Sequence, residues 1–158
     1  MRDIRKLHRD LDSNPLPQAA HNYIIDTFNP EIHKQPWLEL NNLIFAQHPD
    51  QGHWAISDLE TRMAEPWFDP KGFFLAAEAG QIQGFVWTKI HQNPIDQEPV
   101  GELYVVGTHP DHAGHGIARI LSVVAINYLL SKGLKHAILY VDADNERGLK
   151  LYDSLGFN

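Results

Sequence analysis

An apolar strand runs into a glycine-containing turn in Glu102-Leu-Tyr-Val-Val-Gly-Thr-His-Pro-Asp-His-Ala-Gly-His-Gly-Ile-Ala118, and this turn opens directly onto a long amphipathic helix. Gly114 and Gly116 have no Cβ, so the backbone of the turn can come close to a ligand. The first N–H groups of the helix lack partners within the helix and lie at the positive end of its dipole. The stretch therefore predicts a strand–turn–helix unit that binds a diphosphate through main-chain amides.

The spacing of these glycines differs from that of two other phosphate-binding turns. A triphosphate-binding loop ends in Gly-Lys followed by Ser or Thr, and a dinucleotide-binding turn has its glycines directly after the strand. Here Pro110 and Asp111 intervene. Taken alone, the pattern also fits a tight connection between strand and helix that binds nothing. A second motif is needed to decide between the two interpretations.

The second motif consists of Leu139-Tyr-Val-Asp-Ala-Asp-Asn145 and Leu151-Tyr-Asp-Ser-Leu-Gly-Phe157. It indicates a strand, a polar exit and a short helix, with Asn145 as the N-cap and Gly156 just after the helix. In this order, the two motifs resemble the GCN5-related N-acetyltransferase (GNAT) superfamily. The resemblance implies that the first motif binds the pyrophosphate of coenzyme A, and that the second brings an Asn and a Tyr close to the thioester.

Four further stretches are similar to the C-terminal, catalytic domain of the mycothiol synthase family: 41–52, 65–74, 84–89 and 101–107. The similarity extends over roughly residues 27 to 157. It implies acetyl transfer from acetyl-CoA to the cysteinyl amine of cysteine-glucosamine-inositol, the last step in making an actinobacterial thiol. Two alternatives remain open: a related enzyme that acetylates another amine or a peptide N-terminus, and an inactive domain that only binds CoA.

The resemblance also implies the fold and the binding residues. The fold is expected to be α/β, or α+β by some conventions, with a mixed sheet, two parallel strands that splay apart, and helices on both faces. The substrate contacts are expected from Asp50, Lys89, Glu102 and Tyr140, although Tyr140, like Trp87, fits a core position equally well. The residues implied in binding acetyl-CoA are Val106, Gly107, Thr108, Ala113, Gly114, His115, Gly116, Ile117, Ala118, Arg119, Asn145 and Lys150.

Acyl transfer to an amine requires a base for the nucleophile and an acid for the leaving thiolate. Glu102 is the acid residue on the central strand, and we predict that it is the general base; the alternative is an exposed glutamate at a strand edge. Tyr152 follows Asn145 by seven residues, two helical turns, on the same helix face. The resemblance makes Tyr152 the general acid, whereas a core aromatic residue packed against Leu155 or Phe157 is the alternative.

Two departures from the family pattern are visible. Ala113 stands where the superfamily usually has Gln or Arg, which removes one side-chain contact to the pyrophosphate. After Phe157 the superfamily normally adds a last strand, and the mycothiol synthases have two such domains in tandem. We therefore expect residues 1–20 to be a helix and linker that form the remnant of a preceding domain, and residues 21–158 to be the acetyltransferase domain without its last strand.

Composition narrows the class of protein further. The chain has 158 residues, of which 43% are hydrophobic, enough for one globular domain. Its formal charge of −7 argues against nucleic acid as a partner, and the absence of a long apolar run argues against a membrane. We expect a cytoplasmic enzyme with a small-molecule amine substrate. The chain has no cysteine, which excludes disulfides and thiolate chemistry. The oligomeric state stays open.

The ten histidines raise the question of a metal site. His109, His112 and His115 recur at every third residue across the glycine turn, but the sequence places no Cys or paired carboxylate beside them to complete a zinc site. We therefore expect no metal.

Hydrophobic periodicity and turn residues predict the remaining elements. Met1 to Leu11 is expected to be a short helix, and Ser57 is expected to cap a helix that carries Leu59 and Met63. A hairpin should turn at Glu78-Ala-Gly-Gln81. The other predicted elements are a strand over 21–28, a helix over 31–47, strands over 72–79, 82–91, 103–106 and 137–141, and a helix from 116 to 133.

Overall fold

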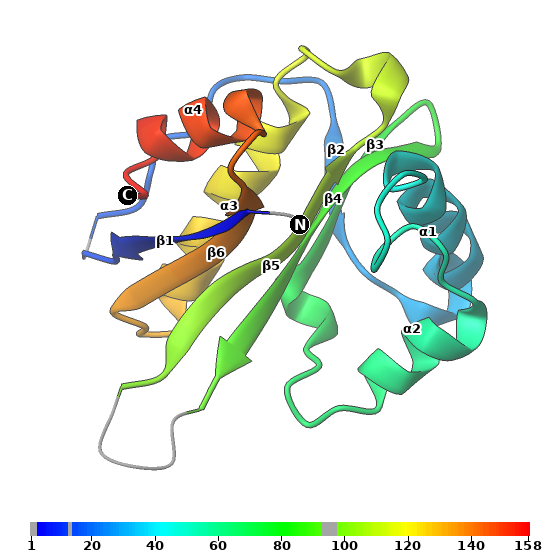
Figure 1. Cartoon of the computed structure of the whole chain (residues 1–158), viewed down its shortest axis with the longest axis horizontal. Helices are drawn as coiled ribbons and strands as arrows, with labels where there is room; N and C mark the ends of the chain where they lie inside the picture. Colours follow the sequence, from blue (N-terminus) through cyan, green and yellow to red (C-terminus); the bar gives the residue numbers. More distant parts are fainter. Residues whose placement is uncertain (1–2, 13, 93–97) are drawn as a thin grey trace.

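The fold is a six-stranded sheet covered by helices on both faces (Figure 1). The computed structural model describes residues 3–12, 14–92 and 98–158. The strands are β1 (Ile4–Asp10), β2 (Ile24–Thr27), β3 (Phe73–Glu78), β4 (Gln81–His91), β5 (Val100–Thr108) and β6 (His136–Asp142). The helices are α1 (Pro30–Ile44), α2 (Ile56–Met63), α3 (Ile117–Ser131) and α4 (Glu146–Ser154), with short 3-10 turns at Pro70–Gly72 and Pro110–His112. The predicted α/β class is confirmed.

The strand order is β1-β6-β5-β4-β3-β2, and only the central β5–β6 pair is parallel. α3 connects these two strands, as a parallel crossover requires. The β3–β4 hairpin turns through Ala79 (φ 53°) and Gly80 (φ 77°), which is the left-handed backbone of a tight two-residue turn. The mixed sheet and the hairpin are therefore confirmed as predicted.

The predicted N-terminal helix is wrong, because Ile4–Asp10 forms strand β1. This strand pairs antiparallel with β6, from Ile4 opposite Asp142 to Asp10 opposite His136. Leu7 packs on the core that β6 and α3 share, and β1 satisfies backbone groups that would otherwise lie at an open sheet edge. The expected missing strand therefore leaves no open edge beside β6, since the chain's own N-terminal strand lies there.

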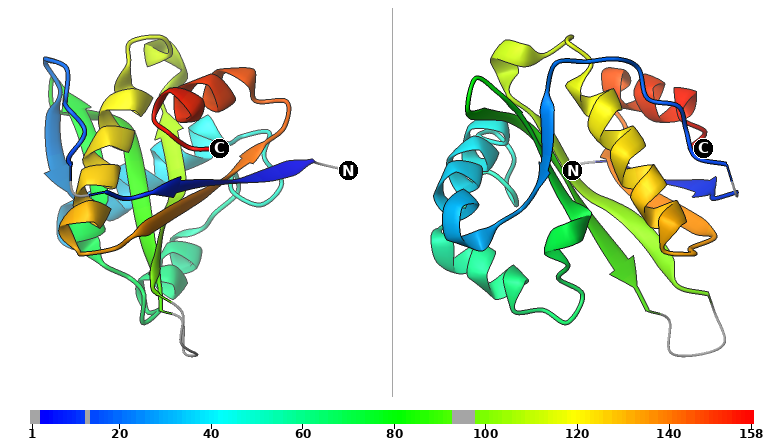
Figure 2. Two further views of the ribbon diagram at one scale, coloured as in Figure 1. Left: turned by 90° about the vertical axis from the view of Figure 1, so that its left-hand side faces the viewer. Right: turned by 180° about the vertical axis from the view of Figure 1, so that it is seen from behind.

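The C-terminus lies on the other side of β1. His8 and Asn158 exchange two backbone hydrogen bonds, with N···O distances of 2.8 and 2.9 Å. Arg9 adds a side-chain bond from its Nε to the carbonyl oxygen of Leu155 at 2.7 Å. The last residues of the chain are thus held along strand β1, beside which the C-terminus lies in Figure 2.

Two hydrophobic cores lie on the two faces of the sheet. α1 and α2 cover one face, where Trp37 is fully buried and meets Phe73, Phe85 and Trp87 edge to face at ring distances of 5.2–5.5 Å. α3 and α4 cover the other face, where the aliphatic side chains of α3 form much of the second core. On the first face, α1 contacts β4 and β5, and Arg62 of α2 donates to the hydroxyl of Tyr104 in β5. In Figure 1, β6 and β1 lie on the opposite side of β5 from these two helices.

The segment between β1 and β2 crosses α3 and connects the two edges of the sheet (Figure 2). Leu16 donates its N–H to Asn127 Oδ1 at 2.8 Å and accepts from Asn127 Nδ2 at 3.0 Å. Gln18 Nε2 adds a bond to the carbonyl oxygen of Ile120. The predicted linker character of this segment is compatible with its irregular backbone, and these bonds fix it to α3.

The expected cap of α2 is also wrong. Ala55 is the N-cap residue, and Asp58 accepts a hydrogen bond from the Ala55 N–H at 2.7 Å, which satisfies the free donor at the helix start. Ser57 lies inside the first turn instead, while Leu59 is buried as predicted. None of the helices in the described part of the chain has the length and apolarity needed to cross a membrane.

Candidate active site

The two parallel strands separate halfway along the sheet. β5 and β6 pair only from Gly101–Ala137 to Leu103–Leu139, and the register stops there. Directly after β5, the N–H of His109 donates to the carbonyl oxygen of Gln83 at 2.8 Å. Because antiparallel residues alternate in the direction of their backbone groups, Val106 and Thr108 direct theirs away from β4, toward the gap. The predicted splay is therefore confirmed.

A cavity of about 290 Å³ occupies this gap. Strand residues of β5 and β6 form its walls, the loop after α1 closes one side, and α4 closes the other. A second cavity of about 550 Å³ shares Phe45, His48 and Asp142 with it, so the two adjoin. The residues lining the cavity in the gap are Ile4, Phe45, His48, Gln51, Leu103, Tyr104, Val105, Val106, Leu139, Tyr140, Val141, Asp142, Asn145 and Tyr152.

The glycine turn at the start of α3 has the backbone that the sequence predicts. Gly114 (φ 86°) and Gly116 (φ 82°) are both left-handed, and an added Cβ would meet no atom within 4 Å at either position. The glycines are thus required by conformation rather than by crowding within the protein. The turn is exposed from Ala113 to Gly116, so its backbone is accessible to an anion.

Not every amide of the predicted pyrophosphate site is available. Ala113 donates its N–H to the carbonyl oxygen of Pro110 at 3.3 Å, and His115 donates to His112 at 3.2 Å. These two amides stabilise the turn itself. The donors that remain for an anion are those of Gly114, Gly116 and the first turn of α3, where the helix dipole is positive.

Tyr152 extends from α4 to the cavity and also packs against Phe157. The role of Tyr152 as general acid stays a prediction. Its ring meets Phe157 edge to face at 6.1 Å, and its side chain lines the gap beside Val106. Burial raises the pKa of the Tyr152 hydroxyl to about 12, because the apolar surroundings disfavour the phenolate. Tyr152 therefore keeps its proton throughout the physiological pH range.

Three polar residues that the resemblance implies in cofactor binding lie near the cavity or on α3 and α4. Asn145 lines the cavity and caps α4 by accepting the Gly148 N–H at 3.0 Å, so the predicted N-cap is confirmed. Arg119 in α3 donates to the hydroxyl of Ser154, which joins the start of α3 to α4. Lys150 lies exposed on α4. The contacts of Arg119, Asn145 and Lys150 with a cofactor stay predictions.

Glu102 is buried, with 7% of its surface exposed, so the alternative of an exposed edge residue is wrong. Its Oε1 lies 2.6 Å from Nε2 of His91 on the neighbouring strand. His91 is partly exposed and connects the buried carboxylate to solvent. Tyr104 of the same strand lines the cavity in the gap, whereas Glu102 is not among its lining residues. We therefore expect a water to carry a proton between Glu102 and a molecule in that cavity.

The predicted substrate residues lie on the sheet face that carries α1 and α2. Lys89 is directly opposite Glu102 in the β4–β5 register, and its ammonium lies 4.5 Å from the Trp67 ring centre. Tyr140 is 53% exposed and lines the cavity, so it is not a core residue, whereas Trp87 is. Asp50 lies in the loop after α1 that supplies His48 and Gln51 to the cavity, but is not itself a lining residue.

His91 was not predicted from the sequence as a partner of Glu102. The signal was the hairpin-like register of β4 and β5, which pairs Lys89 with Glu102 and so places the next residue of the same face, His91, nearby. That register includes an irregularity between Trp87 and Thr88, and the loop between the two strands is long. Without the register, the alternation of side chains could not be assigned to a face.

The three histidines of the glycine turn form a row of rings. His109 and His112 are 5.7 Å apart, and His112 and His115 are 5.8 Å apart, each pair nearly perpendicular. His109 Nδ1 accepts the N–H of Asp111 at 3.0 Å, which caps the short turn before Gly114. These rings pack against one another and cap the turn. Among the described residues, the group whose ligand atoms lie close enough to hold a metal ion does not include these three histidines.

The splayed strands, the glycine turn and the helix that carries Tyr152 are the parts by which acetyltransferases of one family are recognised. A model of the acetyltransferase (GNAT) family matches residues 29–157. The chain belongs to this family.

Within it, curated relatives share a name. A mycothiol acetyltransferase of Thermomonospora curvata is 43% identical over 99% of this chain and 52% of its own length. Another, of Catenulispora acidiphila, is 44% identical over 99% of this chain and 51% of its own. The chain thus spans about half the length of the curated relatives it matches.

Solved structures agree on the fold. A GCN5-related N-acetyltransferase from Sphaerobacter thermophilus superposes with a TM-score of 0.77 at 24% identity, over 99% of this chain and 48% of the other. An aminoglycoside N-acetyltransferase solved with CoA gives 0.67 at 24% identity, over 90% of this chain and 91% of the other. At these identities the agreement concerns the fold alone.

Proposed function

We propose that this chain transfers the acetyl group of acetyl-CoA to the amine of a small molecule. The observation that carries the proposal is the cavity between β5 and β6, with the Val106 backbone directed into the gap and Tyr152 beside it. The family uses acetyl-CoA as donor, and the exposed amides at Gly114 and Gly116 suit its diphosphate. The thioester supplies an activated acyl group when the donor is bound.

On the donor side, the chain stabilises charge and supplies a proton. The Val106 N–H donates a hydrogen bond to the thioester oxygen, which becomes negative as the amine nitrogen bonds to the carbonyl carbon. When the bond between the carbonyl carbon and the sulfur breaks, Tyr152 gives its proton to the departing sulfur, and the second proton that the nitrogen loses as the amide forms restores the Tyr152 hydroxyl. Because the pKa of Tyr152 is raised to about 12, the hydroxyl is fully protonated when the reaction begins.

On the acceptor side, the chain removes a proton from the ammonium group. Glu102 accepts this proton through a water, and His91 at 2.6 Å passes it to solvent. The acceptor lies on the sheet face that carries Tyr140 and Lys89, with these two side chains as contacts. The negative net charge of the chain favours the approach of a cationic amine.

The acceptor that we propose is the cysteinyl amine of cysteine-glucosamine-inositol. The relatives named mycothiol acetyltransferases support it, with 43–44% identity across nearly the whole chain. Asp50 and Tyr140 suit an acceptor rich in hydroxyls, because each offers hydrogen-bonding oxygen. A small-molecule substrate of this kind is a cytoplasmic metabolite, so we also propose that the protein acts in the cytoplasm.

The test is an acetyltransferase assay of the chain with acetyl-CoA and a panel of amines. Because the proposed acceptor has a free thiol, the product is measured by mass spectrometry rather than by thiol-reactive dyes. The panel contains cysteine-glucosamine-inositol, the same molecule without its cysteine, a peptide with a free N-terminus and an aminoglycoside. We expect N-acetylation of the first alone, and preference for another amine would refute the acceptor while retaining the chemistry.

One departure favours a second candidate, a domain that binds CoA without catalysis. Ala113 offers no side-chain contact to a diphosphate, and its N–H is bonded to Pro110. Calorimetry with acetyl-CoA separates the two. Tight binding without turnover of any acceptor would support the inactive domain, whereas turnover would exclude it.

A further inference from the structure

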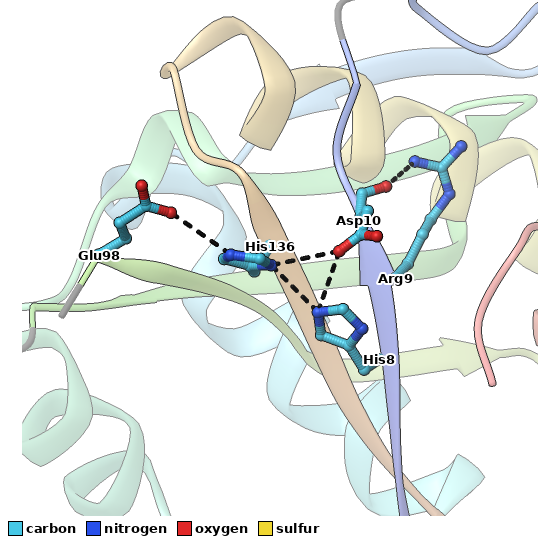
Figure 3. Close-up of polar contacts among 5 residues, drawn as sticks. All are labelled: His8, Arg9, Asp10, Glu98 and His136. Carbon is cyan, nitrogen blue, oxygen red and sulfur yellow. Dashed lines mark hydrogen bonds and ion pairs between the residues drawn. The ribbon is translucent and has the colours of Figure 1, made fainter.

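Three potential metal ligands lie on one face of the β1–β6 ladder (Figure 3). Asp10 is directly opposite His136 in the antiparallel register, and His8 lies two residues before Asp10, on the same side of β1. Among the residues that the structure describes, these three are the one group whose ligand atoms come close enough to hold an ion. They come from opposite ends of the sequence, which no local spacing reveals.

The three ligand atoms form a nearly equilateral triangle. His8 Nε2 is 3.1 Å from His136 Nδ1 and 3.5 Å from Asp10 Oδ1, and His136 Nδ1 is 3.4 Å from Asp10 Oδ1. Zinc bonds of about 2.0–2.1 Å to nitrogen and oxygen put neighbouring ligands of a tetrahedron about 3.3 Å apart. We propose that His8, Asp10 and His136 bind a Zn²⁺ ion as three corners of a tetrahedron, with water at the fourth.

A carboxylate on the outer side of His136 supports this assignment. Glu98 Oε2 lies 3.3 Å from His136 Nε2, the ring nitrogen that faces away from the triangle. A proton on Nε2 leaves the lone pair of Nδ1 free for the metal, and carboxylates commonly orient metal-binding histidines in this way. Glu98 therefore selects the tautomer that the site requires.

The ligand set selects the class of ion. Two imidazoles and one carboxylate suit Zn²⁺ and its borderline neighbours, whereas Mg²⁺ and Ca²⁺ prefer oxygen ligands alone. The charges of Asp10 and Glu98 balance those of the divalent ion. Arg9 does not compete, because its guanidinium donates to the backbone oxygen of Asp10 and to that of Leu155. These bonds fix the backbone that carries Asp10.

A bound Zn²⁺ ion would hold the edge strand β1 against β6. The site joins the C-terminal end of β1 to the N-terminal end of β6, whereas Tyr140 and Asp142, which line the cavity, lie at the other end of β6. Zinc should therefore stabilise the fold without entering the reaction. This inference is independent of the proposed function.

The test is zinc binding by the tag-free chain, measured by calorimetry and by the melting temperature with and without Zn²⁺. Co²⁺ serves as a spectroscopic probe, because its absorption is much stronger in tetrahedral than in octahedral coordination. We expect one equivalent to bind, to raise the melting temperature, and to give the tetrahedral spectrum with Co²⁺. His8→Ala and His136→Ala should each weaken Zn²⁺ binding by at least about 100-fold, and Glu98→Gln by about 10-fold.

His53→Ala is the matched control, because His53 is an exposed histidine in the loop between α1 and α2 and does not belong to the group of three ligands. Melting of each metal-free variant checks the fold, and Asp10→Asn, which preserves side-chain size, replaces any variant that fails to fold. Equal Zn²⁺ affinity in the parent and His136→Ala, or an octahedral Co²⁺ spectrum in the parent, would overturn the proposal.

Discussion

Glu102 and His91 form the residue pair on which proton removal depends. Replacing Glu102 by Gln keeps the shape of the side chain but removes its basicity. We expect kcat/KM to fall by about 100-fold or more, and His91→Gln to cause a smaller loss, because water then carries the proton. Steady-state kinetics with the exposed Glu78→Gln as control measure this. A Glu102→Gln variant as active as the parent would exclude Glu102 as the base.

Tyr152 offers a test that separates chemistry from packing. Tyr152→Phe keeps the ring that contacts Phe157 and removes only the hydroxyl. We expect kcat to fall by about 10- to 100-fold while the dissociation constant of acetyl-CoA stays the same. Calorimetry and kinetics on the same preparation give both values. A loss confined to acetyl-CoA binding would indicate a positioning role instead.

The raised pKa of Tyr152 also predicts how stability depends on pH. The tyrosine ionises near pH 10 in the unfolded chain and near pH 12 in the folded one, so its contribution is complete below pH 10 and is lost as the pH rises to 12. Across that range, the parent should lose about 2 kcal/mol more unfolding free energy than Tyr152→Phe. Tyr128 is common to both proteins, so its own raised pKa cancels. Urea titrations at pH 10 and pH 12 measure this loss for each protein. If the parent and Tyr152→Phe lose the same unfolding free energy between these pH values, the prediction is wrong.

Among the elements, the start of α3 can be tested with a matched glycine. Gly116 and Gly80 have similar positive φ values, and neither would bring an added Cβ within 4 Å of another atom. Alanine at either position should therefore cost about 1 kcal/mol of stability through backbone strain alone. Only Gly116→Ala should also weaken acetyl-CoA binding, because only Gly116 belongs to the diphosphate site. Equal acetyl-CoA affinities in the two variants would remove that site from the turn.

The elements show where the sequence was sufficient and where it was not. The turn at Gly114 and Gly116 and the cap at Asn145 follow from local chemistry, and both were predicted. Strand β1 was not, because Ile4, Leu7 and Leu11 also fit a helical spacing. Its conformation depends on pairing with β6, which lies more than 120 residues away in the chain; Lys6, for example, is opposite Tyr140. No local pattern contains that information.

At the scale of the whole molecule, the segment over α3 connects the two edges of the sheet. Asn127→Ala removes both hydrogen bonds to Leu16 and leaves its backbone groups without these partners. We expect the free energy of unfolding to fall by about 1–3 kcal/mol. Urea unfolding, with the exposed Asn22→Ala as control, measures the difference. No change relative to that control would mean that water replaces both bonds without cost.

The candidate site, like the secondary structure, could be predicted only where neighbouring residues in the sequence determine it. Glu102 and Tyr152 were identified because each belongs to a motif that is contiguous in the sequence. His91 and the His8–Asp10–His136 group were missed, since they depend on the register between strands that the sequence does not specify. Side chains that strand pairing brings together therefore cannot be predicted from the sequence alone.

The central claim is that the gap between β5 and β6 holds the reacting thioester, and a crystal structure of the chain with acetyl-CoA tests it most directly. We predict that the diphosphate contacts the amides of Gly114 and Gly116. The acetyl oxygen should accept a hydrogen bond from the Val106 N–H, with the sulfur beside the Tyr152 hydroxyl. A cofactor bound outside this gap, or one whose sulfur lies beyond the reach of Tyr152, would contradict the account.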